Sequence, residues 1–192
     1  ATRPVATSTR EEGMTLEVIV IAAVRVLGSL PVLRWPFAGA LLAVAVDLSD
    51  LFLMNLLDLG GVPDYQGLDK WLDQVYMATF LVVALRWQGP SRTVAVALYA
   101  YRLVGFIVFE LTGERAVLLL FPNVFELWFL VVAGAHAIGR KPAWTPIRVA
   151  AVGAVLLAIK EAQEWAIHGA RLFDEITAVE AVRRIWEWLT GR

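Results

Sequence analysis

The stretch VAVDLSDLFL, from Val44 to Leu53, places Asp47 and Asp50 inside an otherwise largely apolar run. Two carboxylates three positions apart lie on the same face of a helix. A charge near the centre of a lipid bilayer costs about 2.5–3.5 kcal/mol on insertion scales. These side chains must therefore face the inside of a helix bundle, where they pair with cations, take up protons or contact a bound ion.

The composition of the chain predicts an integral membrane protein. Hydrophobic residues make up 59% of the 192 residues, against about 45–50% in soluble domains. They gather in blocks of roughly 20 residues, long enough to cross a hydrocarbon layer about 30 Å thick. Tryptophan is enriched where membrane helices meet the headgroups, and the block ends carry Trp35, Trp71, Trp87 and Trp144.

The predicted fold is all-α, a polytopic membrane helix bundle of about six transmembrane helices with a C-terminal amphipathic helix. Residues 1–13 form a flexible N-terminal tail, 14–170 the six-helix domain, and 171–192 an amphipathic helix at the interface. The expected location is a bacterial plasma membrane, crossed several times, with the lipid bilayer and other membrane subunits as partners. The expected spans are 16–33, 37–57, 71–87, 93–111, 116–138 and 147–168.

The predicted direction of insertion in the membrane depends on which basic residues are counted. Basic residues in the turns after the first, third and fifth spans predict extracytoplasmic termini. Including Arg3, Arg10, Arg171, Arg183 and Arg184 in the tails predicts the opposite direction.

Charged residues within the expected spans predict a polar cluster at mid-depth. Positive residues are Arg25, Arg102 and Lys160, and carboxylates outnumber them. Intramembrane ionisable residues usually serve a binding site or an ion path, although buried ion pairs can also fix helix register. We expect Arg102 and Lys160 to be partners of the aspartates. The candidate residues for binding or an ion path are Asp47, Asp50, Arg102, Glu110, Asn123, Glu126, Lys160 and Glu164.

Pro122 offers two interpretations of the stretch LFPNVFELWF, from Leu120 to Phe129. A proline inside a helix removes a backbone donor and causes a kink. Freed backbone groups are then tolerated where protein or a water-filled cavity satisfies them, so Asn123 and Glu126 would line a cavity. Alternatively, the helix begins at Pro122, because proline suits the first turn.

Cofactor chemistry is restricted by composition. The absence of cysteine excludes iron–sulfur clusters. The two histidines, His136 and His168, lie near the ends of consecutive antiparallel spans, so a haem held by paired histidines is not expected. A divalent cation bound by Asp58, Asp69 and Asp73 is one interpretation of the acidic loop, and a solvated acidic loop is the other. Nucleic acid is not an expected partner, because the sequence has no basic patch with interleaved aromatic residues.

Two family comparisons arise from short motifs. The spacing of Asp47 and Asp50 invites comparison with the CDP-alcohol phosphotransferases, but the glycine and Ala-Arg of their motif are missing. The chain instead resembles a group of uncharacterised bacterial six-span membrane proteins. The segments that carry this resemblance are Asp69-Lys-Trp-Leu-Asp73, Arg102-Leu-Val-Gly105, Phe121-Pro-Asn-Val-Phe-Glu126 and Lys160-Glu-Ala-Gln-Glu164. The resemblance implies one compact membrane domain.

Three functions remain open from the sequence. The surplus of carboxylates favours transport of a proton, a small cation or a cationic solute. The modest size and the lack of a catalytic motif favour an accessory or assembly subunit of a larger membrane complex. In a membrane-embedded lipid-modifying enzyme, the carboxylates would hold a metal or act as bases, and Arg102 and Lys160 would bind a phosphate group.

Overall fold

The described part of the chain is helical throughout. This computed structural model describes residues 16–49, 65–114, 116–164, 186–187 and 190–191. Within those ranges the all-α prediction is confirmed. The elements are α1 (Leu16–Ser29), the short 3₁₀ helix η1 (Leu30–Leu33), α2 (Pro36–Leu48), α4 (Tyr65–Ala84), α5 (Pro90–Thr112), α6 (Ala116–Leu120), α7 (Val124–Ala137) and α8 (Pro146–Glu164).

Proline and glycine set several helix boundaries. Pro36, Pro90 and Pro146 each occupy the first position of a helix, where the missing N–H has no intrahelical partner to lose. Gly113 ends α5 with φ of 68°, a left-handed conformation that costs glycine little. Each of the six expected segments contains a described helix. The N-terminal tail, the end of the second segment and nearly all of the C-terminal amphipathic helix lie outside the described residues.

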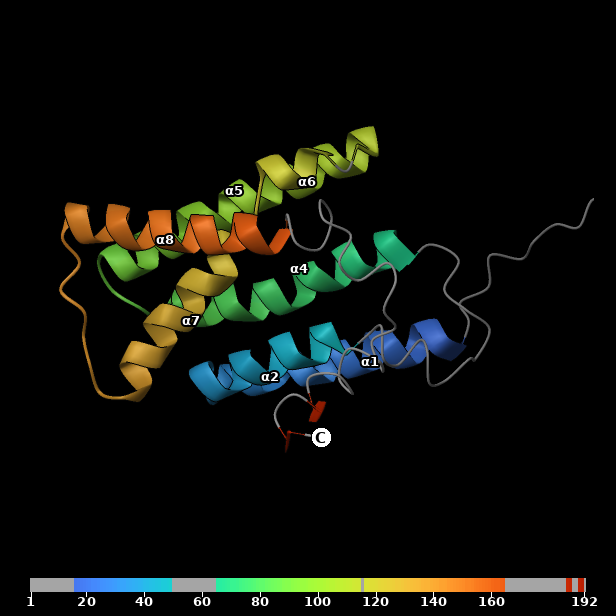
Figure 1. Cartoon of the computed structure of the whole chain (residues 1–192), viewed down its shortest axis with the longest axis horizontal. Coiled ribbons are helices and arrows are strands. Elements are labelled where there is room, and N and C mark those ends of the chain that lie inside the picture. The colour runs from blue at the N-terminus through green and yellow to red at the C-terminus, as the bar shows by residue number, and fades with distance from the viewer. Residues whose placement is uncertain (1–15, 50–64, 115, 165–185, 188–189, 192) are drawn as a thin grey trace, which may run out of the picture.

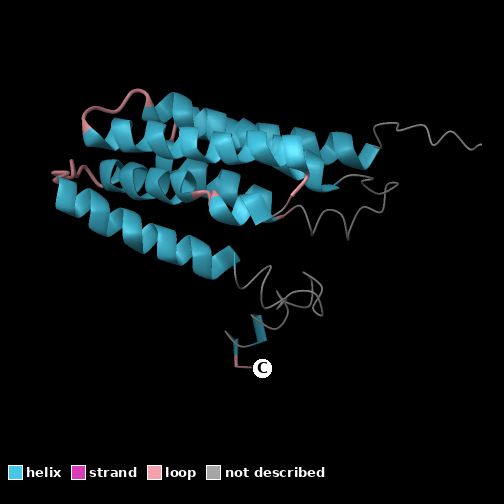
Figure 2. Ribbon diagram, turned by 90° about the horizontal axis from the view of Figure 1, so that it is seen from above, coloured by secondary structure: helices cyan, strands magenta, loops and turns pink. Residues whose placement is uncertain are grey.

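The helices run in alternating directions along the bundle. The connections from α1 to α2, from α4 to α5 and from α7 to α8 therefore meet at one end, on the left in Figure 1. Helix α4 contacts α1, α2, α5 and α7, while α8 packs against α7. Figure 2 shows α8 as the lowest helix of the bundle.

The apolar core lies where α4 meets α7. Phe80, Phe125, Trp128 and Phe129 are fully buried there. The rings of Phe80 and Phe129 stack at 4.3 Å between centroids, and Trp87 extends the stack at 5.1 Å from Phe129.

Two of the described helical segments, and not six, are long and apolar enough to cross a membrane by length and composition. They are Pro90–Thr112 and Val117–Ala137, with 23 and 21 residues. The others fall short for physical reasons. Pro36–Leu48 has 13 residues, about 20 Å at 1.5 Å per residue, and the first turns of α4 carry charged side chains.

Several charged side chains are buried beside the apolar core, although charged residues of soluble proteins are almost never fully buried unless they are paired. Arg25, Asp73, Arg102, Glu126 and Lys160 are each at most 8% exposed. Many large apolar side chains lie on the outside, and several are 48–80% exposed: Leu27, Leu41, Val104, Ile107, Leu111, Ile147, Val155 and Ile159.

We expect Gly39→Ala to destabilise the fold. A Cβ at Gly39 would lie 2.3 Å from the backbone nitrogen of Val32, so α2 and η1 could no longer pack closely. The midpoint of thermal unfolding of the purified protein should fall by several degrees. Gly153→Ala is the matched control because nothing lies within 4 Å of its Cβ position, and alanine favours the helix by about 1 kcal/mol. Equal midpoints for both variants would contradict the close approach.

Candidate functional site

Arg25 is the centre of a buried ion cluster that joins three helices. Its guanidinium lies on α1, and its Nη2 pairs with Asp47 Oδ1 of α2. Its Nη1 lies 2.8 Å from Asp69 Oδ1, and its Nη2 lies 2.8 Å from Asp73 Oδ1, both on α4. Only 3% of the Arg25 side chain is exposed. A planar fork with five donors suits such multiple pairing, whereas an ammonium group would not span these carboxylates.

Two further cations complete what we call the Arg25 cluster, consisting of Arg25, Asp47, Asp69, Lys70, Asp73 and Arg102. Lys70 Nζ lies 2.5 Å from Asp69 Oδ2 and 3.3 Å from Asp73 Oδ2. Arg102 of α5 reaches Asp73 Oδ2 at 4.0 Å through Nη2. The cluster therefore sets three cations against three carboxylates.

The groups at the start of α4 are held in their charged forms. Burial alone would raise the pKa of Asp69, but the nearby Lys70 ammonium and Arg25 guanidinium together hold it below its ordinary value. Burial likewise opposes the charge on Lys70, yet Asp73 and Asp69 raise the pKa of Lys70 above its ordinary value. Both residues precede the apolar segment that begins at Trp71.

The carboxylates of the cluster are close enough together to hold a metal ion, but cations of the chain already neutralise them. One oxygen from each of Asp47, Asp69 and Asp73 lies within 4.8 Å of the others. Arg25 contacts all three of these residues, so a divalent ion would have to displace it. The expected metal site combined Asp69 and Asp73 with Asp58, which lies outside the described residues.

Pro122 interrupts the helix, and side chains of α5 satisfy the carbonyl groups that become free. Helix α6 ends at Leu120 and α7 begins at Val124 with Asn123 as its cap, so Pro122 lies in the break between two helices and not in the first turn of α7. Arg102 Nη1 donates to the carbonyl of Phe121 at 2.7 Å, and Tyr101 Oη donates to that of Leu120. Protein groups thus replace the hydrogen bonds lost at the break, as such positions require.

A second polar group, the Tyr76–Asn123–Glu126 triad, lies next to the break. Tyr76 Oη donates to Glu126 Oε2 at 2.7 Å, and Asn123 Nδ2 lies 3.0 Å from Tyr76 Oη and 3.3 Å from Glu126 Oε2. Asn123 also caps α7 by accepting a hydrogen bond from the backbone N–H of Glu126. All three residues are buried. Among the described contacts, the carboxylate of Glu126 has neutral donors and no cation.

The structure brings only some of the predicted site residues together. Asp47, Asp69, Asp73 and Arg102 share the Arg25 cluster, while Asn123 and Glu126 share the triad. Lys160 is buried on α8, where its Nζ bonds to Gln163 Oε1 at 3.2 Å, so it is not a described partner of Asp47. Glu110 is exposed on α5. Asp50 and the side chain of Glu164 lie outside the described part of the chain.

Three residues that proved central were not among the predicted site residues: Arg25, Lys70 and Tyr76.

Comparison with protein-family models, with curated proteins and with solved structures gave no match for the chain. Function is therefore inferred from the geometry of the Arg25 cluster and the triad.

We expect Arg25→Gln to lower the free energy of unfolding by about 3–5 kcal/mol, because removing one partner leaves buried charges without compensation. Urea or thermal unfolding of the purified protein measures this change. Arg140→Gln is the matched control: Arg140 is exposed, and surface substitutions usually change stability by less than about 0.5 kcal/mol. Equal stability of the two variants would show that the Arg25 cluster does not hold the helices together.

Proposed function

We propose that the chain is an integral membrane protein with several membrane-crossing helices. The many exposed leucine and isoleucine side chains support this location, because water penalises such faces, whereas lipid accepts them. Contiguous apolar surfaces beyond a few hundred Å² are rare on soluble monomers. Charges inside a membrane bundle face its interior and pair with each other, as the Arg25 cluster does.

The activity that we propose is movement of a proton or small cation along the polar face of α4. Asp69, Asp73 and Tyr76 follow one another at spacings of four and three residues, so they share one face of that helix. This face runs from the Arg25 cluster to Glu126, the carboxylate hydrogen bonded to Tyr76.

The proposal depends on the buried carboxylate of Glu126, beside which no cation lies among the described contacts. It is only 8% exposed, and its described hydrogen bonds come from the neutral groups of Tyr76 and Asn123. A buried carboxylate without a fixed cation is costly, and a mobile cation or proton would offset that cost. The carboxylates of the Arg25 cluster already have fixed cations, so Glu126 is the better position for an exchanging one.

A buried donor between the two polar groups supports a hydrated path. Arg102 Nε has no hydrogen-bond partner among the described residues, although Arg102 is 6% exposed. A buried donor without a partner costs about 1–3 kcal/mol, and a water molecule bonded there would remove the cost.

The path is closed toward the other end of the bundle. Phe80 and Phe129 stack at 4.3 Å beyond Glu126, Trp87 continues the stack, and His136 meets the edge of Trp87 at 5.7 Å. Cation movement across the whole membrane therefore requires this aromatic stack to shift.

A structural subunit of a membrane complex is the second candidate. The observation that favours it is that Arg25 pairs with aspartates of two other helices, α2 and α4. Such pairing fixes the register of α1, α2 and α4 without any bound ion.

We expect Glu126→Gln to reduce ion flux by about two orders of magnitude, because a positioned proton-transfer group contributes about that much. The purified protein is reconstituted in liposomes, and flux is followed with a pH-sensitive dye and with K⁺ and Na⁺ gradients. Tyr76→Phe should give a smaller loss, since it removes the hydroxyl that donates to Glu126.

Glu110→Gln is the control, because Glu110 is an exposed carboxylate on α5 and the variant should retain the wild-type flux. Flux through the wild-type protein equal to that of protein-free liposomes would exclude the transport proposal and leave the structural subunit. Extraction of the protein from cell membranes by alkaline carbonate would contradict the membrane location itself.

A further inference from the structure

One end of the bundle is strongly basic. The connections on the left in Figure 1 and the helix ends beside them carry six cationic side chains. The sequence ranges 30–46, 84–100 and 134–150, which form this end, contain neither Asp nor Glu. We call these six residues the basic end: Arg34, Arg86, Arg92, Arg140, Lys141 and Arg148.

None of these cations has a carboxylate partner within the described ranges. Arg86 Nη1 donates to the carbonyl of Leu33 at 3.4 Å, and Arg148 Nη1 donates to that of Ala143 at 3.1 Å. The carboxylates lie instead on the opposite side of the bundle, as Asp47, Asp69 and Asp73 do. The basic end is therefore a positively charged surface that attracts anions.

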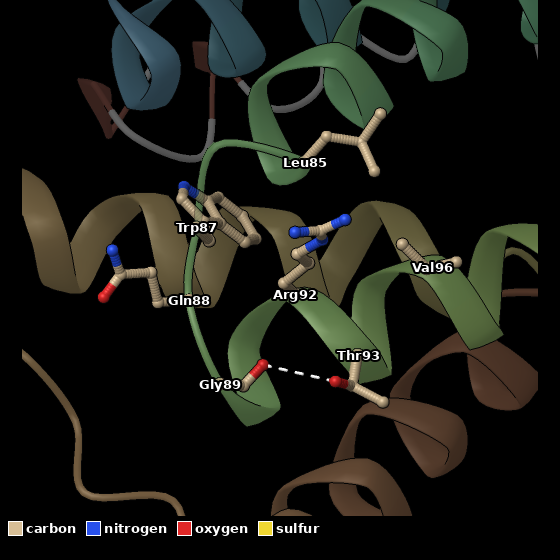
Figure 3. Close-up of a pocket in the computed structure, with 7 residues that line it drawn as sticks. All are labelled: Leu85, Trp87, Gln88, Gly89, Arg92, Thr93 and Val96. Atoms are coloured by element: carbon tan, nitrogen blue, oxygen red, sulfur yellow. Dashed lines mark hydrogen bonds between the residues drawn. The ribbon is translucent and has the colours of Figure 1, made fainter.

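A pocket of about 570 Å³ opens at the basic end, between the end of α4 and the start of α5. Arg92 lies in the middle of it in Figure 3, with Leu85 and Val96 to one side and Trp87 and Gln88 to the other. Arg92 is exposed, and no hydrogen bond or ion pair holds its guanidinium among the described residues. The pocket thus combines apolar walls with a cation that is available for a ligand.

We propose that this pocket binds the phosphate group of an anionic lipid headgroup. Arg92 would pair with the phosphate oxygens, since a guanidinium forms two parallel hydrogen bonds with such groups. The amide of Gln88 can donate to the glycerol oxygens of the headgroup. The positive end of the α5 dipole at Pro90 adds to the attraction for a negative charge.

The walls of the pocket favour a lipid over a free phosphate ion. Leu85 is 44% exposed and Val96 is 37% exposed, and both continue the outward apolar faces of α4 and α5. An acyl chain could follow those faces while its headgroup remains at Arg92. Trp87, which is mostly buried against Phe129, closes the pocket on the side of the bundle core. This inference rests on the proposed membrane location but is independent of ion movement.

The test is native mass spectrometry of the purified full chain in detergent, titrated separately with dihexanoyl phosphatidylglycerol, dihexanoyl phosphatidylcholine and inorganic phosphate. We expect phosphatidylglycerol to bind most tightly, because the choline cation would be repelled by the basic end. Arg92→Gln should raise the Kd for phosphatidylglycerol about tenfold, the effect of losing one charged hydrogen-bonding partner. Arg34→Gln, which removes a cation of the same end outside the pocket, should change it less than about twofold.

Each outcome decides the proposal. Equal affinity of wild type and Arg92→Gln for phosphatidylglycerol, or equal affinity of the two lipids for the wild type, would overturn it. Binding of inorganic phosphate that depends on Arg92 and matches the lipid in affinity would support the phosphate chemistry and assign a free anion as its source. Glu126→Gln should retain lipid binding, so a failure of the transport proposal would leave this result unchanged.

Discussion

The guanidinium of Arg25 joins α1 to α2 and to α4 through three aspartates, and the rest of the bundle depends on this contact. Taking an arginine and three carboxylates out of water costs several kcal/mol per ion, so the helices must hold all of them within hydrogen-bonding distance. Asp69 and Asp73 are one turn apart on α4 and meet Arg25 at 2.8 Å each. A slip of α1 by one residue would separate the guanidinium from these oxygens. The ion cluster therefore fixes helix register more strictly than apolar packing alone, which tolerates small shifts.

Once α4 is fixed, its remaining faces position the other features. The face that carries Asp73 continues to Tyr76, and Tyr76 reaches Glu126 across the break at Pro122. One turn further, the same face becomes aromatic at Phe80, and the polar path stops. Arg102 serves two purposes here, because it approaches Asp73 and also satisfies the carbonyl of Phe121. Gly105, one turn along α5, leaves the room that the Phe121 side chain needs at this crossing. The break in the α6–α7 segment and the ion cluster are thus parts of one polar arrangement.

The sequence predicted the helices and the burial of charge better than it predicted the pairing. Apolar blocks bounded by proline and glycine located most described helices, but α4 begins at Tyr65, six residues before the expected span. Arg102 and Glu126 are buried, and Asp47 pairs with the buried Arg25, as the cost of lipid-exposed charge predicts. Pairing depends on the rotation of each helix about its axis, which residue spacing alone does not determine. The sequence therefore predicted Arg102 and Lys160 as the partners of the aspartates, whereas Arg25 is the central partner in the structure. Consecutive elements usually pack together, and this rule could have paired Arg25 with Asp47 on the next helix. Glu110 was misplaced for the same reason: its rotation on α5 exposes it. The prediction of six membrane-length helices was wrong, because two described helices reach that length and apolar composition. The prediction considered the apolar content of each block but not its charged residues or the positions where its helix ends.

A double-mutant cycle between Arg25 and Asp73 tests the central claim most directly, because it measures the coupling of α1 to α4. The free energy of unfolding would be measured for the wild type, Arg25→Gln, Asp73→Asn and the double variant in the same detergent. Residues in one buried ion network show coupling energies of about 0.5–3 kcal/mol. We expect a value in the upper half of that range, with the double variant more stable than the sum of the single losses predicts. Additivity within about 0.3–0.5 kcal/mol would contradict the claim that this ion cluster holds the bundle in register.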